Sequence, residues 1–420
     1  MSKLSGKRDH PPVKPVKTIE VSDGNRKWKL VAIVLLLALG VTLIATAVAG
    51  FLSVEPGWET IQAGNVQESC AGEFVFLYLL GDGEEAPNLE QREITTLYTQ
   101  ATKDAYQIFH EEEVFEGVQN VAYLNAHPNE EVEIPKVLYD AFVLLEQHQN
   151  RGIYLAPLYQ EYIGLFLSDE DWNAELYDPA KSPEQRQYFD EVLSFIGDEN
   201  AIQLELLGNN RVKLRVSDAY AAYAATNEIT KFINFYWMKN AFIADYLAEQ
   251  MILAGYTKGT ITSFDGFGRN LDITEETYQL NLFDRVGKDV FQCGILGYSG
   301  VKSLVSLRNY PMSELAVQLY YQWEDDSITS CHIDPADGKN KSALNDLTGY
   351  SRTLSCAEVL LRLYPVYVTE DLDVDALSNL PWQGIQTVYC KDSVIYTSDE
   401  KAVVTGLYEK DSVKYTWQKG

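Results

Sequence analysis

The sequence predicts an α+β protein, with one compact domain of mixed helices and strands behind a single apolar helix near the N-terminus. Residues 89–110 and 182–198 repeat apolar side chains at helical spacing. Residues 201–217 instead alternate apolar and polar side chains around a Gly-Asn-Asn turn, as a β-hairpin does. Strand-like runs follow from residue 287 onward, so helices first precede the strands and then interleave with them.

The N-terminal part differs in composition from the rest of the chain. Residues 1–29 hold eight Lys and Arg against three Asp and Glu, and residues 30–51 carry no charge. At ~1.5 Å per residue, a helix over 30–51 spans about 33 Å, close to the thickness of a bilayer's hydrocarbon core. Basic residues on one side only place the tail in the cytoplasm and the main domain outside. A cleaved signal peptide is the alternative, since Ala47-Val48-Ala49 fits a cleavage site.

This pattern predicts a single-pass protein of the cell membrane in four parts. They are a basic cytoplasmic tail (1–29), a transmembrane helix (30–51), a linker (52–72) and an extracytoplasmic domain (73–420). The formal charge is −27, and an acidic body repels phosphate backbones, which argues against nucleic-acid binding. Five Cys occur without a CxxC spacing. An exported location permits disulfides, but the spacing does not decide which thiols pair.

The elements of the domain are predicted in chain order from their local signals. Residues 73–80 form an apolar strand before a Gly-Asp-Gly turn, and a helix follows over 89–110. A second helix covers 132–150, with Pro135 near its start, and Ser182 caps a third over 182–198. After the hairpin, a long helix is expected over 228–256. A strand followed by a Gly turn is expected over 259–272, and further strands are expected at 287–297, 301–309, 315–324, 328–334, 363–369, 384–389 and 393–397.

The stretch "HIDPADG" (332–338) combines a His with two turn-forming dipeptides. Asp-Pro and Asp-Gly both favour tight bends, and an Asp side chain accepts hydrogen bonds from nearby backbone amides. A neutral His332 beside a phosphate could also orient or deprotonate an acceptor hydroxyl. The motif alone leaves a structural turn and a functional loop both open.

The order of several segments resembles the FAD:protein FMN transferase (ApbE-like) family over roughly residues 73–400. The family's "GxFDPTVxPL" corresponds to "RGIYLAPLYQEYIGLF" (151–166), and its "KGYAxD" to "NAFIADYLAEQMILAGY" (240–256) with Asp245 retained. A strand with a Gly-Gly turn corresponds to "TITSFDGFGRNLD", which contains Gly266 and Gly268. The family's "HxIDPxTG" matches "HIDPADG", and "ADAxxT" corresponds to "AEVLLR" (357–362).

The resemblance implies an exported protein that binds FAD and magnesium and moves FMN onto a Thr or Ser of a target protein. On these positions it implies a catalytic role for His332 and a metal ligand at Glu358. It further implies flavin or phosphate contacts from one group of residues: Asp334, Gly266, Gly268, Asp245 and Arg362. A hard cation on oxygen ligands is what such a pyrophosphate reaction needs.

Two positions depart from the family pattern where the metal would bind. The Asp and Thr of "ADAxxT" are replaced by Glu358 and Arg362, and a guanidinium cannot ligate a cation. The simpler interpretation is a Glu–Arg pair one helical turn apart, although an Arg could instead fork onto a pyrophosphate. The leading hypothesis is therefore a degenerate flavin- or nucleotide-binding or interaction module, with a flavinylated or surface protein as partner. The alternatives are an active transferase and a surface scaffold without a ligand.

Overall fold

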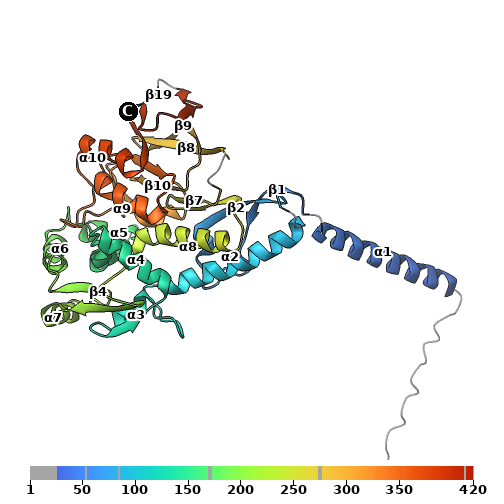
Figure 1. Cartoon of the computed structure of the whole chain (residues 1–420), viewed down its shortest axis with the longest axis horizontal. Coiled ribbons are helices and arrows are strands. Elements are labelled where there is room, and N and C mark those ends of the chain that lie inside the picture. Colours follow the sequence, from blue (N-terminus) through green and yellow to red (C-terminus); the bar gives the residue numbers. More distant parts are fainter. Residues whose placement is uncertain are drawn as a thin grey trace, which may run out of the picture. The chain divides into compact units, whose positions relative to one another are not determined.

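The computed structural model describes residues 26–52, 54–83, 86–168, 173–272, 277–410 and 413–419. The chain divides into two compact units, Met1–Val54 and Glu55–Gly420. Most of the predicted basic tail, residues 1–25, lies outside the described residues. The first unit contains helix α1 (Arg26–Leu52), drawn in blue in Figure 1.

The transmembrane prediction was checked on the helices of the described residues. Within this part of the chain, none is both long enough and apolar enough to cross a membrane. The transmembrane helix predicted over 30–51 therefore finds no support.

The second unit is mixed α+β, as predicted. Its helices are α2 (Pro87–Phe109), α3 (Val121–Ala126), α4 (Lys136–Gln147), α5 (Ala156–Phe166), α6 (Pro183–Ile196), α7 (Asp218–Thr226), α8 (Lys239–Leu253), α9 (Cys356–Tyr367) and α10 (Val374–Asn379). Its first strands are β1 (Gly57–Ile61), β2 (Phe74–Leu80), β3 (Glu131–Glu133), β4 (Ile202–Gly208), β5 (Arg211–Val216), β6 (Gly259–Ser263), β7 (Phe267–Asn270), β8 (Thr277–Val286), β9 (Asp289–Ser299) and β10 (Ser303–Arg308). The remaining strands are β11 (Tyr320–Gln322), β12 (Ile328–Ser330), β13 (Asp346–Ser351), β14 (Gln386–Lys391), β15 (Val394–Thr397), β16 (Val403–Thr405), β17 (Glu409–Lys410), β18 (Val413–Lys414) and β19 (Thr416–Lys419).

The main sheet has the strand order β1-β2-β6-β7-β10-β13-β14-β15-β19 in the described residues. Its pairs are antiparallel except β15 with β19, which is parallel. Helix α8 packs against β6 and β7 and also contacts α2 and α9 (Figure 1). This helix is nearly enclosed, because side chains on most of its faces are buried. It therefore connects the sheet to the helices.

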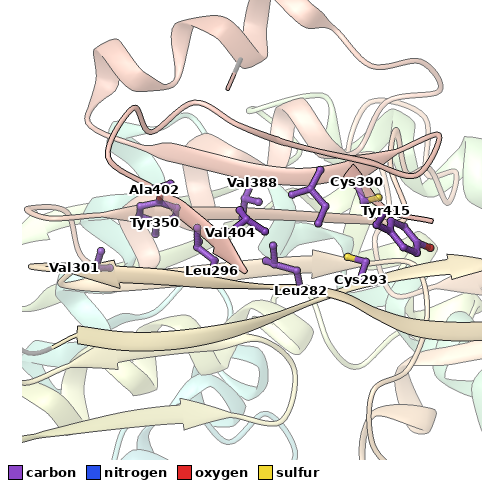
Figure 2. Close-up of a cluster of buried hydrophobic side chains, with 11 residues drawn as sticks. Leu282, Cys293, Leu296, Val301, Tyr350, Val388, Cys390, Ala402, Val404 and Tyr415 are labelled. Atoms are coloured by element: carbon purple, nitrogen blue, oxygen red, sulfur yellow. The ribbon is translucent and has the colours of Figure 1, made fainter. Parts of the chain in front are cut away.

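An apolar cluster joins the main sheet to the three-stranded sheet β16-β9-β8. Figure 2 shows Leu282, Leu296 and Cys293 of β8 and β9 facing Val388 and Cys390 of β14. All five side chains are buried. The free, buried Cys293 and Cys390 thus pack here as small apolar groups.

Several predicted segments differ from the structure. The linker predicted over 52–72 is wrong in part, because Gly57–Ile61 forms β1 and pairs along its length with residues 76–80 of β2. The strand predicted over 363–369 is wrong, because helix α9 continues to Tyr367. Its apolar residues lie on the buried side of a helix, and a short apolar run does not distinguish a helix from a strand. Residues 316–319 of the strand predicted over 315–324 form a 3₁₀ helix.

The long helix predicted over 228–256 begins only at Lys239. The buried Asn125 of α3 accepts hydrogen bonds from the backbone N–H groups of Phe232 and Ile233 at 2.9 and 3.0 Å, and its amide donates to the Ile233 carbonyl at 2.9 Å. These bonds hold the segment before α8 in an irregular path. A partner more than 100 residues away, at a sequence separation of 107, thus overrides the local helical pattern.

The turn between β6 and β7 requires glycine at Gly266 but not at Gly268. Gly266 has φ +104°, and a Cβ there would collide with the Ser306 carbonyl oxygen of β10. A Cβ at Gly268 would meet Thr262 and Leu304 at ordinary distances of 3.6 and 3.7 Å.

We expect Gly266→Ala to lower the free energy of unfolding by at least about 1–2 kcal/mol, the cost of placing an L-residue at positive φ, with the collision added. Gly268→Ala is the matched control and should change it by less than about 1 kcal/mol. Urea unfolding of both variants measures the difference. Equal stabilities would contradict this account of the turn.

Candidate functional site

A cavity of about 320 Å³ lies where α8, the β6–β7 turn and the segment before α8 meet. We call it the Asp265 cavity. Its lining residues are Glu73, Glu111, Ile163, Leu167, Tyr236, Trp237, Lys239, Asn240, Phe264, Asp265, Gln318 and Leu319.

Asn240 connects two carboxylates in the wall of this cavity. It is 1% exposed, and its Nδ2 donates to Glu73 Oε2 and Asp265 Oδ2, both at 3.0 Å. Glu73 Oε1 also pairs with the ammonium of Lys239 at 3.1 Å. Because both partners of Nδ2 accept hydrogen bonds, the orientation of the amide is determined. Its oxygen, Oδ1, is buried without a partner, and so is Asp265 Oδ1.

The electrostatics of the cavity follow from these contacts. The pKa of Asp265 is raised to about 7, chiefly because the carboxyl group is buried and also because Glu73 is near, while the hydrogen bond from Asn240 opposes the shift. Burial opposes the charge of Lys239, but Glu73 and Glu111 outweigh it and hold the pKa of Lys239 above its ordinary value. Asp265 therefore titrates near neutral pH in a wall that also contains charged groups.

Aromatic side chains form the apolar part of the lining. Tyr236 has φ +46°, and its backbone N–H donates to Asn234 Oδ1 at 2.6 Å. A non-glycine residue at positive φ is strained and persists only where its surroundings hold it. Trp237 follows and turns its ring toward the interior of the protein, where it contacts His332 and Tyr364, with ring centroids 4.8 Å away in both cases.

His332 lies in this aromatic core rather than in the cavity lining. It is 4% exposed, its ring also meets Tyr367 edge-on at 5.1 Å, and burial lowers the pKa of His332 to about 3. The imidazole is therefore neutral at pH 7 and enclosed by rings. The structure supports a packing role behind Trp237 and gives no support to the predicted catalytic role.

Asp334 belongs to a closed turn. Its Oδ1 accepts from the Ala336 N–H at 2.8 Å, and its Oδ2 pairs with Lys341 at 2.7 Å. Lys341 also pairs with Asp337 at 2.9 Å. A Cβ at Gly338, where φ is +67°, would press against side chains of α5 and α6. The "HIDPADG" stretch thus forms the structural turn that its dipeptides favour.

Asp245 makes hydrogen bonds and an ion pair inside the protein. It accepts from the backbone N–H groups of Cys356 and Ala357, both at 2.9 Å, at the N-terminus of α9. It also pairs with Nε of the buried Arg269 at 2.7 Å. Burial raises the pKa of Asp245, and Arg269 and the two amides oppose the rise. Neither Asp245 nor Arg269 lines the Asp265 cavity.

Glu358 caps the helix that carries it and also pairs with Arg362. The Ser355 N–H donates to Glu358 Oε2 at 2.8 Å, and the Glu358 N–H donates to Ser355 Oγ at 3.2 Å, which completes a capping box. Arg362 Nη2 lies 3.9 Å from Glu358 Oε1. In the described residues no three His, Cys, Asp or Glu side chains are grouped so that they could hold a metal ion.

The residues predicted from the sequence therefore do not converge on one cleft. His332, Asp334, Glu358, Arg362 and Gly268 are absent from the lining of the Asp265 cavity. Of the predicted site residues, only Gly266 borders the cavity, because the preceding residue, Asp265, lines it. The sequence analysis missed Glu73, Lys239 and Asp265 as site residues. A carboxylate directly before the predicted Gly turn is the one signal that could have drawn attention to this wall.

Comparison with solved structures identifies the fold. The chain is similar to the ApbE protein of Thermotoga maritima, with a TM-score of 0.53 and 14% identity over 83% of this chain and 97% of that one. It is also similar to a mutant form of the flavin transferase ApbE from Vibrio cholerae, with a TM-score of 0.50 and 11% identity over 84% and 98% of the two chains. No protein-family model and no curated protein matches the sequence. The ApbE-like fold predicted from the order of segments is confirmed.

The raised pKa of Asp265 makes stability depend on pH. The folded protein binds this proton more tightly than the unfolded chain, so its contribution to stability is present below pH 3.8 and is lost as pH rises through about 7. Asp265→Asn cannot ionise. We expect this variant to melt at a higher temperature than the wild type at about pH 8, and at a similar temperature near pH 4. A constant difference across this range would contradict the assignment.

The buried pair of Asp245 and Arg269 should be a major contributor to stability. Asp245→Asn leaves a buried guanidinium without its counter-charge, which costs about 3–5 kcal/mol in comparable pairs. Glu358→Gln is the control, since its half-exposed pair with Arg362 is worth about 0.3–0.5 kcal/mol. Chemical denaturation of both variants tests the ranking. Adding Arg269→Met to Asp245→Asn should recover part of the loss.

Proposed function

We propose that this protein is a ligand-binding module built on the ApbE-like fold, and that it does not carry out magnesium-dependent flavin transfer. The observation that carries the proposal is the pair of Glu358 and Arg362 on α9. Glu358 closes a capping box and faces a guanidinium one helical turn away. The positions that the family resemblance implies for metal binding are thus occupied by an internal contact.

Magnesium does not fit this donor set. A Mg²⁺ ion requires near-octahedral oxygen ligands, whereas Arg362 offers only N–H donors and carries a positive charge. One carboxylate oxygen of Glu358 already accepts the Ser355 N–H. The nearby Asp245 supplies its two oxygens to the N-terminus of α9 and to Arg269. These contacts leave no pair of free oxygens for the cation.

The anionic half of a dinucleotide also fits the Asp265 cavity poorly. Glu73, Glu111 and Asp265 contribute three carboxylates to its lining, against the single ammonium of Lys239. A pyrophosphate placed among these groups would be repelled. The aromatic lining could still accept a planar or apolar group. These features support binding of a small ligand over phosphoryl-group chemistry.

The proposal predicts that the full-length chain, given FAD, Mg²⁺ and a target protein with an acceptor Thr, attaches no flavin to that target. Mass spectrometry and in-gel flavin fluorescence of the target detect the product. The variant Glu358→Asp with Arg362→Thr restores two oxygens one turn apart. We expect this variant, and not the wild type, to gain a Mg²⁺-dependent increase in melting temperature. Covalent labelling of the target by the wild type would overturn the proposal.

A further inference from the structure

The charge balance of the Asp265 cavity favours a cationic ligand. Three carboxylates and one ammonium line it, and the ammonium of Lys239 is already paired with Glu73. When all four groups are ionised their sum is −3 + 1 = −2. In a partly buried wall a negative excess of this kind attracts a positive group and stabilises its charged form.

Two buried acceptors of the wall lack donors, and Tyr236 Oη and Trp237 Nε1 of the same lining also have no hydrogen-bond partner. Asn240 is 99% buried, and both hydrogens of its amide face carboxylates, so Oδ1 is left without a donor. Asp265 Oδ1 is likewise shielded and without a donor. A buried acceptor that lacks a donor destabilises the protein. Both residues belong to the cavity wall, so these oxygens add to the negative potential that a cation in the cavity meets.

The rest of the lining suits a compact apolar body. Tyr236, Trp237 and Phe264 provide aromatic surface, and Ile163 and Leu319 provide aliphatic surface. Aromatic faces also attract cations, most strongly when water is excluded. A volume of about 320 Å³ lies at the small end of ligand pockets, which range from about 300 to 1,000 Å³.

We infer that the Asp265 cavity binds a small organic cation, namely a primary ammonium group on a compact apolar or aromatic body. The ammonium lies against the carboxylates of the wall, and the apolar body lies against the aromatic side of the cavity. This inference rests on the proposed function, because it gives the Asp265 cavity to a cation and not to an anionic dinucleotide.

Three probes with the same body and different head groups test the inference on the full-length chain. They are 2-phenylethylammonium, 2-phenylethanol and phenylacetate, and calorimetry measures each dissociation constant near pH 8, where Asp265 is ionised. A charge-assisted hydrogen bond is worth about 1.5–3 kcal/mol, so we expect the ammonium to bind at least about tenfold more tightly than the alcohol. Phenylacetate should bind weakest. No detectable binding of the ammonium, or equal or reversed affinities, would overturn the inference.

Variants with opposite expected effects connect the binding to this cavity. Asp265→Asn should weaken binding of 2-phenylethylammonium about tenfold or more, and Lys239→Gln should strengthen it, because it removes the competing cation beside Glu73. Asp375→Asn removes the same charge from an exposed site on α10 and should leave the affinity unchanged. A similar loss in both cavity variants would place the binding elsewhere and overturn the assignment.

The two proposals fail in different assays. Flavin transfer by the wild type would overturn the proposed function. If the affinities of the three probes follow a different order, only the inference about the cationic ligand is overturned. The proposal that the protein does not transfer flavin is unaffected by that result.

Discussion

The buried carboxylate of Asp245 holds three elements of the second unit together. From α8 it receives two backbone N–H groups of α9 and the guanidinium of Arg269 on β7. A buried charge is tolerated only when its hydrogen-bonding capacity is filled, so these partners must stay in place for the fold to persist. The position and rotation of α8 follow from this contact. Asn240 lies about a turn and a half earlier on the same helix, so the contact also determines where its amide meets the cavity.

At the Asp265 cavity, by contrast, the hydrogen-bonding capacity of the buried groups is not filled. Asn240 fills one side of Glu73 and Asp265 with its N–H groups, but its own oxygen and one oxygen of Asp265 lack donors. The backbone of Tyr236 is held at positive φ beside them. Strain and unsatisfied buried groups persist where the surroundings enforce them, and they cluster at functional sites. Both oxygens of Asp245 have partners, whereas one oxygen of Asp265 and the oxygen of Asn240 have none.

The "HIDPADG" stretch resembles a family motif, but its contacts in this protein are those of a structural turn. Its Asp334 and Asp337 share Lys341, and Tyr162 of α5 donates to the Gly338 carbonyl at 3.2 Å. His332 fills the core behind Trp237. Each group has a partner inside the protein, so the turn stabilises the fold without requiring a ligand. The pair of Glu358 and Arg362 is similar, since Glu358 caps the helix that carries both residues and faces Arg362 one turn away.

The sequence by itself determined the local features: the α+β class, the order of segments, the cap at Ser182, the hairpin over 201–217 and the Glu–Arg pair on α9. These depend on side-chain periodicity, turn residues and contacts within a few positions, all of which can be read along the chain. Only the tertiary structure decided the start of α8, the strand within 52–72 and the Asp265 cavity. Glu73 meets Asn240 across 167 residues and Asn125 meets Phe232 across 107. Such contacts form only when burial brings distant segments together, because no local preference specifies which distant side chain fills a buried hydrogen bond.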